Sequence, residues 1–115
     1  MTELTDTDIS SLNGLAHALR LFNELGRASI SVSMFCLIAT HEGFSVTDYS
    51  RRAGIQFNLA GRQIADLSHV DRNGSPGLGF IEKRIGNGRE VCCYLTVRGR
   101  AFAKRVALAV GSRAA

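Results

Sequence analysis

Amide and guanidinium side chains recur near the middle of the chain. Gln56, Asn58, Arg62 and Gln63 lie at or near the start of a segment, residues 57–69, whose apolar spacing predicts a helix. Asparagine and glutamine form paired hydrogen bonds with adenine, and arginine forms them with guanine. We therefore take these four residues as candidates for reading base edges in a DNA groove, a chemistry of hydrogen bonding rather than of bond making.

Residues that make or break bonds form no recognisable constellation. His17, His41 and His69 share no metal-ligand spacing with one another or with the cysteines. No Ser-His-Asp order and no paired carboxylates are recognisable, and Gly77-Leu78-Gly79 is too short for a phosphate loop and precedes a strand. We predict a protein that is not an enzyme and that has no metal and no cofactor.

Composition and charge favour a globular protein with an anionic partner. The 115 residues are 45% hydrophobic and 21% charged, which fits a single domain over residues 1–115. The net charge of +4 is uneven, because residues 1–50 hold 2 basic and 6 acidic residues, and residues 51–115 hold 12 and 4. A basic half points to a polyanion, although a merely solvated surface is the alternative reading.

The cysteines and the N-terminus predict a cytoplasmic location. The acidic start lacks the features of a signal peptide, and no apolar stretch is long enough to cross a membrane. Three cysteines, Cys36, Cys92 and Cys93, without a CxxC pair argue against a disulfide framework. We expect each to be a small buried hydrophobe, with redox sensing at Cys92 as the alternative.

Apolar periodicity and turn residues predict a mostly helical α+β chain. Asp6 or Asp8 would cap the first helix, Ser31 or Ser29 the second and Thr96 the last, while Gly54 would close the third. Residues 44–46 are expected to form a bridging strand, residues 71–78 a loop, and Gly86-Asn87-Gly88 a hairpin turn. Gly61, inside a helix, suggests close approach to another backbone, and the last residues, 111–115, look disordered. The predicted helices span residues 6–26, 32–41, 48–53, 57–69 and 97–110, and the strands span residues 79–85 and 89–95.

This order of elements is the layout of a winged helix-turn-helix. The third and fourth helices would pack through their apolar sides, which leaves the polar side of the fourth free to enter a major groove. The hairpin would form a wing beside it. Five cations and one amide around both elements are candidates for backbone or minor-groove contacts: Arg51, Arg52, Lys83, Arg84, Asn87 and Arg89. The alternative is that the arginines are solvated or pair with Asp66 and Glu82.

The first helix carries an apolar surface wider than one contact needs. It is either sunk in its own core or packed on a second subunit, and in so short a chain we favour a homodimer. The expected interface residues lie on the first and last helices: Ile9, Leu12, Leu15, Leu19, Phe22, Phe102 and Val106.

Four stretches together resemble the MarR-like winged helix-turn-helix regulators. They are residues 35–43 with 45–48, residues 62–67, residues 79–84, and residues 95–100, which resemble the family's LTxxG entry into its last helices. The resemblance implies dimerisation helices at 5–29 and 96–110 and a DNA-binding core at 31–95 with its wing at 79–95. This sequence departs from the family in its short C-terminal region and its long 71–78 loop.

The resemblance implies a function as well as a fold. It implies a sequence-specific regulator of transcription that binds double-stranded DNA as a homodimer. A compact dimer without an activation segment favours a repressor acting on a palindromic operator. A small-molecule or redox effector stays open as a further partner. The alternatives are a winged-helix module that binds a protein, and a plasmid or phage replication or partition factor.

Overall fold

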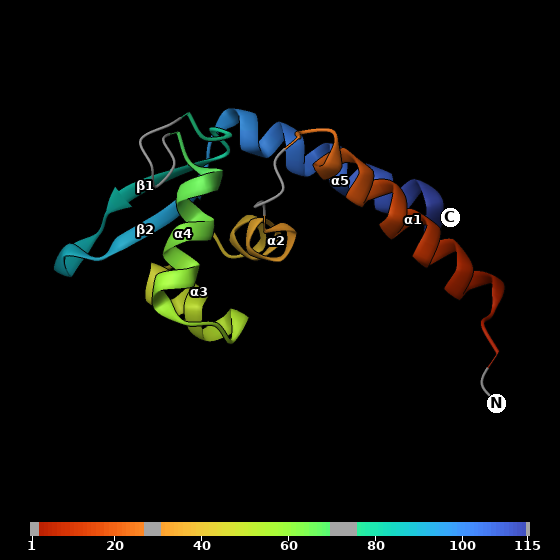
Figure 1. Cartoon of the computed structure of the whole chain (residues 1–115), viewed down its shortest axis with the longest axis horizontal. Helices are drawn as coiled ribbons and strands as arrows, with labels where there is room; N and C mark the ends of the chain where they lie inside the picture. Colours follow the sequence, from red (N-terminus) through yellow and green to blue (C-terminus); the bar gives the residue numbers. More distant parts are fainter. Residues whose placement is uncertain (1–2, 27–30, 70–75, 115) are drawn as a thin grey trace. The chain divides into compact units, whose positions relative to one another are not determined.

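The computed structural model describes residues 3–26, 31–69 and 76–114 (Figure 1). The chain divides into two compact units. We call residues 29–102 the winged unit, and residues 1–28 with 103–115 the helical unit. The elements, in chain order, are α1 (Asp6–Asn23), α2 (Val32–Thr40), α3 (Val46–Ala53), α4 (Phe57–Leu67), β1 (Ile81–Ile85), the 3-10 turn η1 (Asn87–Arg89), β2 (Val91–Leu95) and α5 (Val97–Ala114).

Reciprocal caps begin α1 and α3. The Thr5 hydroxyl accepts the Asp8 amide at 3.1 Å, and the Asp8 carboxylate accepts the Thr5 amide at 2.9 Å. Ser45 and Asp48 repeat this arrangement. The prediction that Asp6 or Asp8 is the first cap is therefore wrong, because Asp8 is the partner three residues inside the helix. For the same reason α3 begins at Val46, before the predicted residue 48.

The remaining helix boundaries are close to the predicted ones. Ser31 caps α2 by accepting the Met34 amide at 3.0 Å, as predicted, while Ser29 lies outside the described residues. Gly54 closes α3 in the left-handed region at φ 69°, also as predicted. Helices α1, α2 and α4 end before the predicted residues 26, 41 and 69, and α5 continues past 110 into the stretch expected to be disordered. Most of the predicted 71–78 loop lies outside the described residues.

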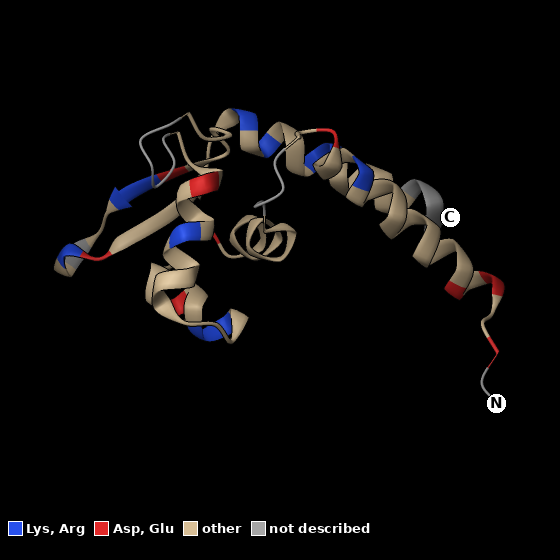
Figure 2. Ribbon diagram, viewed as in Figure 1, with Lys and Arg blue, Asp and Glu red and all other residues tan. Residues whose placement is uncertain are grey.

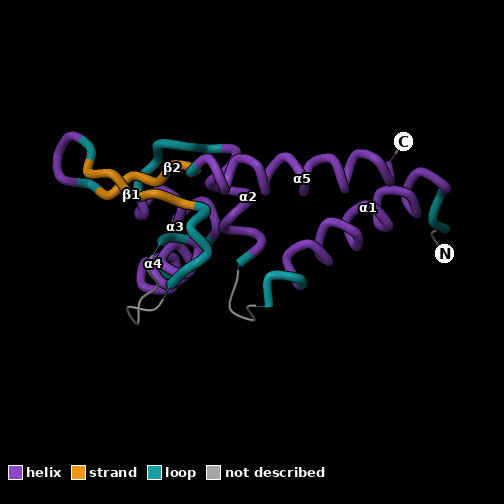
Figure 3. Tube along the Cα trace, turned by 90° about the horizontal axis from the view of Figure 1, so that it is seen from above, coloured by secondary structure: helices purple, strands orange, loops and turns teal. Residues whose placement is uncertain are grey.

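The wing is a two-stranded antiparallel hairpin (Figure 3). Its register pairs Ile81 with Leu95 and Ile85 with Val91, so both strands are shorter than predicted. Five residues, 86–90, join them, and the Gly86 amide donates to the Glu90 carbonyl at 2.8 Å. The predicted turn of three residues, 86–88, is wrong. Arg89 adopts φ 66° and belongs to η1 rather than to β2.

A short segment before α3 pairs with the other edge of β2. Ser45 forms an isolated bridge with Cys92, and the Gly43 amide donates to the Cys93 carbonyl at 2.8 Å. The Cys93 amide in turn donates to the Phe44 carbonyl at 3.1 Å. These bonds confirm the expected bridge at Ser45, whereas Val46 already belongs to α3, so the bridging strand is shorter than the predicted 44–46. They also tie the start of α3 to the wing.

An aromatic cluster forms the centre of the winged unit. The ring centroid of Phe35 lies 5.7 Å from that of Phe80 and 5.6 Å from that of Phe102, and Phe80 and Phe102 stack at 4.7 Å. All three side chains are buried, so Phe102, expected at the dimer interface, packs in the core of the single chain. Cys36, on the outer side of α2, is exposed, which corrects the expectation of a buried thiol.

The start of α5 is fixed to the winged unit by close backbone contacts. Thr96 accepts the Gly99 amide at 3.0 Å, as predicted for a cap, and donates to the Gly79 carbonyl at 2.6 Å. A Cβ on Gly99 would lie 2.0 Å from the Phe80 carbonyl oxygen, so only glycine fits there. Glu42 accepts the Leu95 amide at 2.7 Å and pairs with Arg100 at 3.0 Å.

None of the helices in the described parts of the chain is both long and apolar enough to span a bilayer.

Candidate nucleic-acid interface

Helix α4 has a buried side and an exposed polar side. Ala60, Ile64 and Leu67 are almost fully buried against the rest of the winged unit. Asn58 and Arg62, four residues apart, are exposed on the opposite side. Gln56, the residue before the helix, is exposed too, whereas Gln63 is half-buried on its flank. The structure thus places Asn58 and Arg62 together and leaves Gln63 less accessible than expected.

The acidic residue of α4 does not oppose this basic face. Asp66 is 8% exposed, at the end of the helix where residues 77–80 return along it. It forms no ion pair with Arg62 in the described chain. The outer side of α4 therefore presents hydrogen-bonding groups and a cation.

A buried tyrosine sets the position of α3. Its hydroxyl donates to the His41 carbonyl and accepts the Phe44 amide at 3.3 Å. Burial raises the pKa of Tyr49 to about 12, so the phenol stays neutral. At the start of the same helix, hydrogen bonds from the Ser45 side chain and backbone lower the pKa of Asp48. The hydrogen bonds of Tyr49 and those between Ser45 and Asp48 together fix the first turn of α3.

The end of α3 presents two exposed arginines. The guanidinium carbon of Arg52 lies 4.6 Å from the Phe44 ring centroid, a cation–π contact that orients this side chain. Arg51, its neighbour, is also exposed. Both lie at the end of α3 that precedes α4, and Figure 2 shows the basic segments there, on α4 and on the hairpin.

The wing carries cations in different environments. Arg84 pairs with Glu82 and stacks 4.3 Å from the Tyr94 ring centroid, so the expected alternative of intramolecular pairing holds for this residue. Lys83 and Arg89 are exposed and take part in neither ion pair found among the described residues. The backbone of Asn87 lies in η1, and its side chain is outside the described part.

A groove separates α4 from the wing. Its volume is about 430 Å³. Phe57, 55% exposed, borders this groove and was missed as a site residue because apolar periodicity assigned no role to it. Gly61 also borders it, and a Cβ added there would meet no other part of the chain within 4 Å, so the expected close backbone approach is not made within the described residues. The lining residues come from α3, α4 and the wing: Ser45, Val46, Thr47, Phe57, Gly61, Ile64, Lys83, Arg89, Glu90 and Val91.

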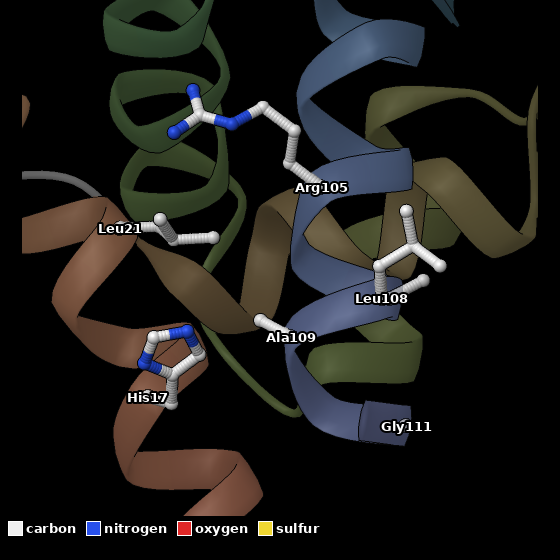
Figure 4. A pocket seen from close by; sticks show the side chains of 7 residues that line it. His17, Leu21, Arg105, Leu108, Ala109 and Gly111 are labelled. Carbon is white, nitrogen blue, oxygen red and sulfur yellow. The ribbon is translucent and has the colours of Figure 1, made fainter. Parts of the chain in front are cut away.

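The helical unit presents apolar side chains of its own. Ile9, Leu12, Leu15 and Leu19 are 36–53% exposed along α1, whereas Phe22 is buried and Val106 half-buried. A groove of about 510 Å³ lies between α1 and α5. Figure 4 shows that Leu21 and His17 face it from one side. From α5 it is lined by Arg105, Ala107, Leu108, Ala109 and Gly111.

The cysteines differ in accessibility. Cys93 is fully buried in β2, and burial raises its pKa to about 11. Cys92, on the other side of the strand, is half-buried, so the expectation of a buried thiol is met in full only by Cys93. Partial burial raises the pKa of the exposed Cys36 as well. No group of three or more His, Cys, Asp or Glu side chains capable of holding a metal occurs among the residues described.

Solved structures share this arrangement. A crystal structure of a MarR-family transcriptional regulator from Silicibacter pomeroyi matches with a TM-score of 0.63 at 15% identity, over 92% of this chain and 67% of that one. A MarR-family protein of Mycobacterium tuberculosis, in complex with p-aminosalicylic acid, matches at 0.54 and 20%, over 90% and 74%. AbfR in its disulfide form matches at 0.58 and 14%, over 91% and 70%. No protein-family model and no curated protein matches the sequence.

These matches define the class of fold. The chain is a winged-helix protein, with α3 and α4 as its helix-turn-helix and the β1–β2 hairpin as its wing. More particularly, its fold is MarR-like. The predicted fold class is confirmed. At identities of 14–20%, these matches support the fold and nothing beyond it.

Proposed function

We propose that the chain is a transcriptional regulator that binds double-stranded DNA sequence-specifically, as a homodimeric repressor on a palindromic operator. The observation that carries this proposal is the outer side of α4, where Asn58 and Arg62 are exposed side by side and the one acidic residue of the helix is buried. An α-helix fits the major groove, and these side chains are the ones that pair with adenine and guanine edges.

The surrounding cations support a duplex as the ligand. Arg51 and Arg52 lie in the last turn of α3, and Lys83 and Arg89 lie on the wing. Arg89 has a positive φ of 66°, a conformation that glycine adopts at lower cost, as Gly88 does beside it. An arginine at this strained position is consistent with a side chain that is used, and a phosphate or minor-groove contact is the use we assign to it.

The homodimer rests on the helical unit. Four large apolar side chains in one stripe of α1 remain exposed in the single chain, and exposed apolar patches mark interaction sites. A second copy offers the same stripe, so a self-complementary contact between the two is the arrangement we assign. Such a dimer would present two α4 helices to two half-sites, which favours a palindrome.

A small-molecule or redox effector is a further part of this proposal. A MarR-family protein of the same fold was solved with p-aminosalicylic acid, and AbfR of the same fold in a disulfide form. In this chain the groove beside Arg105 and the thiols of Cys36 and Cys92 are where such partners would act.

Selection of DNA tests the proposal. The purified chain is mixed with random duplexes, and bound molecules are recovered and sequenced at two salt concentrations. We expect an enriched sequence with two inverted half-sites about one helical turn apart. Enrichment of no sequence would contradict sequence-specific binding and would leave the protein-interaction module as the better account.

A further inference from the structure

Five large apolar side chains are exposed in the described part of the winged unit. Among the large apolar residues exposed in its described part, Phe57 and Leu59 lie on α4, and Ile85 and Val91 pair at the far end of the hairpin. Only Val97, at the start of α5, lies elsewhere. Hydrogen bonds to bases and salt contacts with phosphates account for none of these side chains.

Phe57 occupies a defined place among these side chains. It is the first residue of α4, directly before Asn58, and it is 55% exposed. It borders the groove to the wing, together with Gly61 one turn further on. Because Gly61 has no side chain, the wing side of Phe57 stays open along the helix.

The charges around Phe57 select the kind of surface that covers it. Lys83 and Arg89 line the same groove, with Glu90 as its acidic member. An apolar side chain that shares a groove with two cations and one carboxylate suits a polyanion that offers an apolar group. In a major groove that group is the C5-methyl of thymine, which lies at the base edge beside the hydrogen-bonding atoms.

We propose that the Phe57 ring contacts a thymine methyl group in the major groove and so determines one position of the recognised sequence. This inference rests on the proposed function. Phe57 and Asn58 are consecutive at the start of α4, about 1.5 Å apart along the helix axis and about 100° apart around it. We therefore assign the Phe57 contact to the base pair that Asn58 binds or to a neighbouring one. A thymine is therefore expected next to the base that Asn58 binds.

Replacement of thymine by uracil in the selected duplex tests the proposal, because uracil lacks only the methyl group. Burial of one methyl group corresponds to about a fourfold change in Kd, so one uracil in each half-site is expected to weaken wild-type binding by about that factor per half-site. Phe57→Ala is expected to lose about the same factor on the thymine site and nothing further on the uracil site. Phe57→Leu, which keeps an apolar side chain, should still distinguish the two.

Val97→Ala is the matched control, because Val97 is exposed and apolar but lies at the start of α5 and does not line the groove that Phe57 borders. It should respond to uracil as the wild type does. Equal binding of thymine and uracil sites by the wild type, or a fourfold loss that persists in Phe57→Ala, would overturn the inference. Either result would leave the proposed function intact, whereas failure to select any sequence would contradict the proposed function itself.

Discussion

The winged unit and the helical unit treat their large apolar side chains differently. In the winged unit Phe35, Ile38, Tyr49 and Ile64 are at most 1% exposed. In the helical unit the leucines and isoleucine of one stripe of α1 keep 36–53% of their surface exposed. The winged unit has a buried core in the single chain, and its exposed apolar residues lie on α4, on the hairpin and at the start of α5. We infer that the helical unit completes its core with another copy of the chain.

Polar groups show the same contrast. Glu42 and Thr96 each join segments distant in sequence through half-buried hydrogen bonds. In α1 the side-chain bonds at Thr5 and Asp8 are local and cap the helix. Long-range polar contacts therefore fix the geometry of α3, α4 and the wing, which a groove-reading surface requires.

The largest expected effect lies in the winged core. Phe35→Ala removes the ring that contacts both Phe80 and Phe102, so we expect a loss of about 3–5 kcal/mol in the free energy of unfolding. Urea unfolding followed by circular dichroism measures it. The loss should be the same at low and high protein concentration. A loss below about 1 kcal/mol would mean that this cluster is not the centre of the core.

The next effect concerns self-association. Leu15→Glu places a charge in the exposed stripe of α1. We therefore expect the Kd of the dimer to rise at least about tenfold, with little change in the helicity of the monomer. Sedimentation equilibrium measures this. Leu4→Glu is the control, because Leu4 is 62% exposed and precedes α1. If both variants associate like the wild type, the stripe is not the interface.

The contrast also explains what the sequence could reveal. Element order, the Ser31, Gly54 and Thr96 caps, and the side of α4 that carries Asn58 follow from local patterns, and all are found. The Thr5–Asp8 and Ser45–Asp48 capping boxes are equally local and were readable in the pattern of Thr or Ser three residues before Asp. Both wrong predictions, the cap of α1 and the start of α3, concern these two boxes.

Other features depend on contacts between distant residues. The role of Glu42, which binds the Leu95 amide 53 residues later, leaves no local pattern. Neither does the burial of Phe102 in the core, or the exposure of Cys36 on a helix that is otherwise mostly apolar. The position of Phe57 beside a groove depends on the wing, and no local pattern places the wing next to α4.

The smallest expected effect is a pH dependence of the winged unit. The pKa of Tyr49 is raised to about 12, so its neutral form stabilises the fold fully below pH 10, and that stabilisation is lost as pH rises from about 10 to 12. In Tyr49→Phe the fall in unfolding free energy over this range should be shallower. Parallel slopes in the wild type and Tyr49→Phe would contradict the assignment.

The central claim is that α4 reads bases and the wing holds the backbone. The most direct test compares Arg62→Ala and Arg89→Gly on the selected DNA site and on variants with single base-pair changes, over a range of salt concentrations. Arg89→Gly keeps the positive φ without strain, so it removes the side chain while preserving the turn.

We expect Arg62→Ala to lose discrimination at one base pair, worth about 1–3 kcal/mol, with a salt slope close to that of the wild type. Arg89→Gly should weaken binding to all sites alike and lower the slope by about 0.9 for the lost phosphate contact. Unchanged discrimination in Arg62→Ala, together with equal salt slopes in all three proteins, would contradict the account.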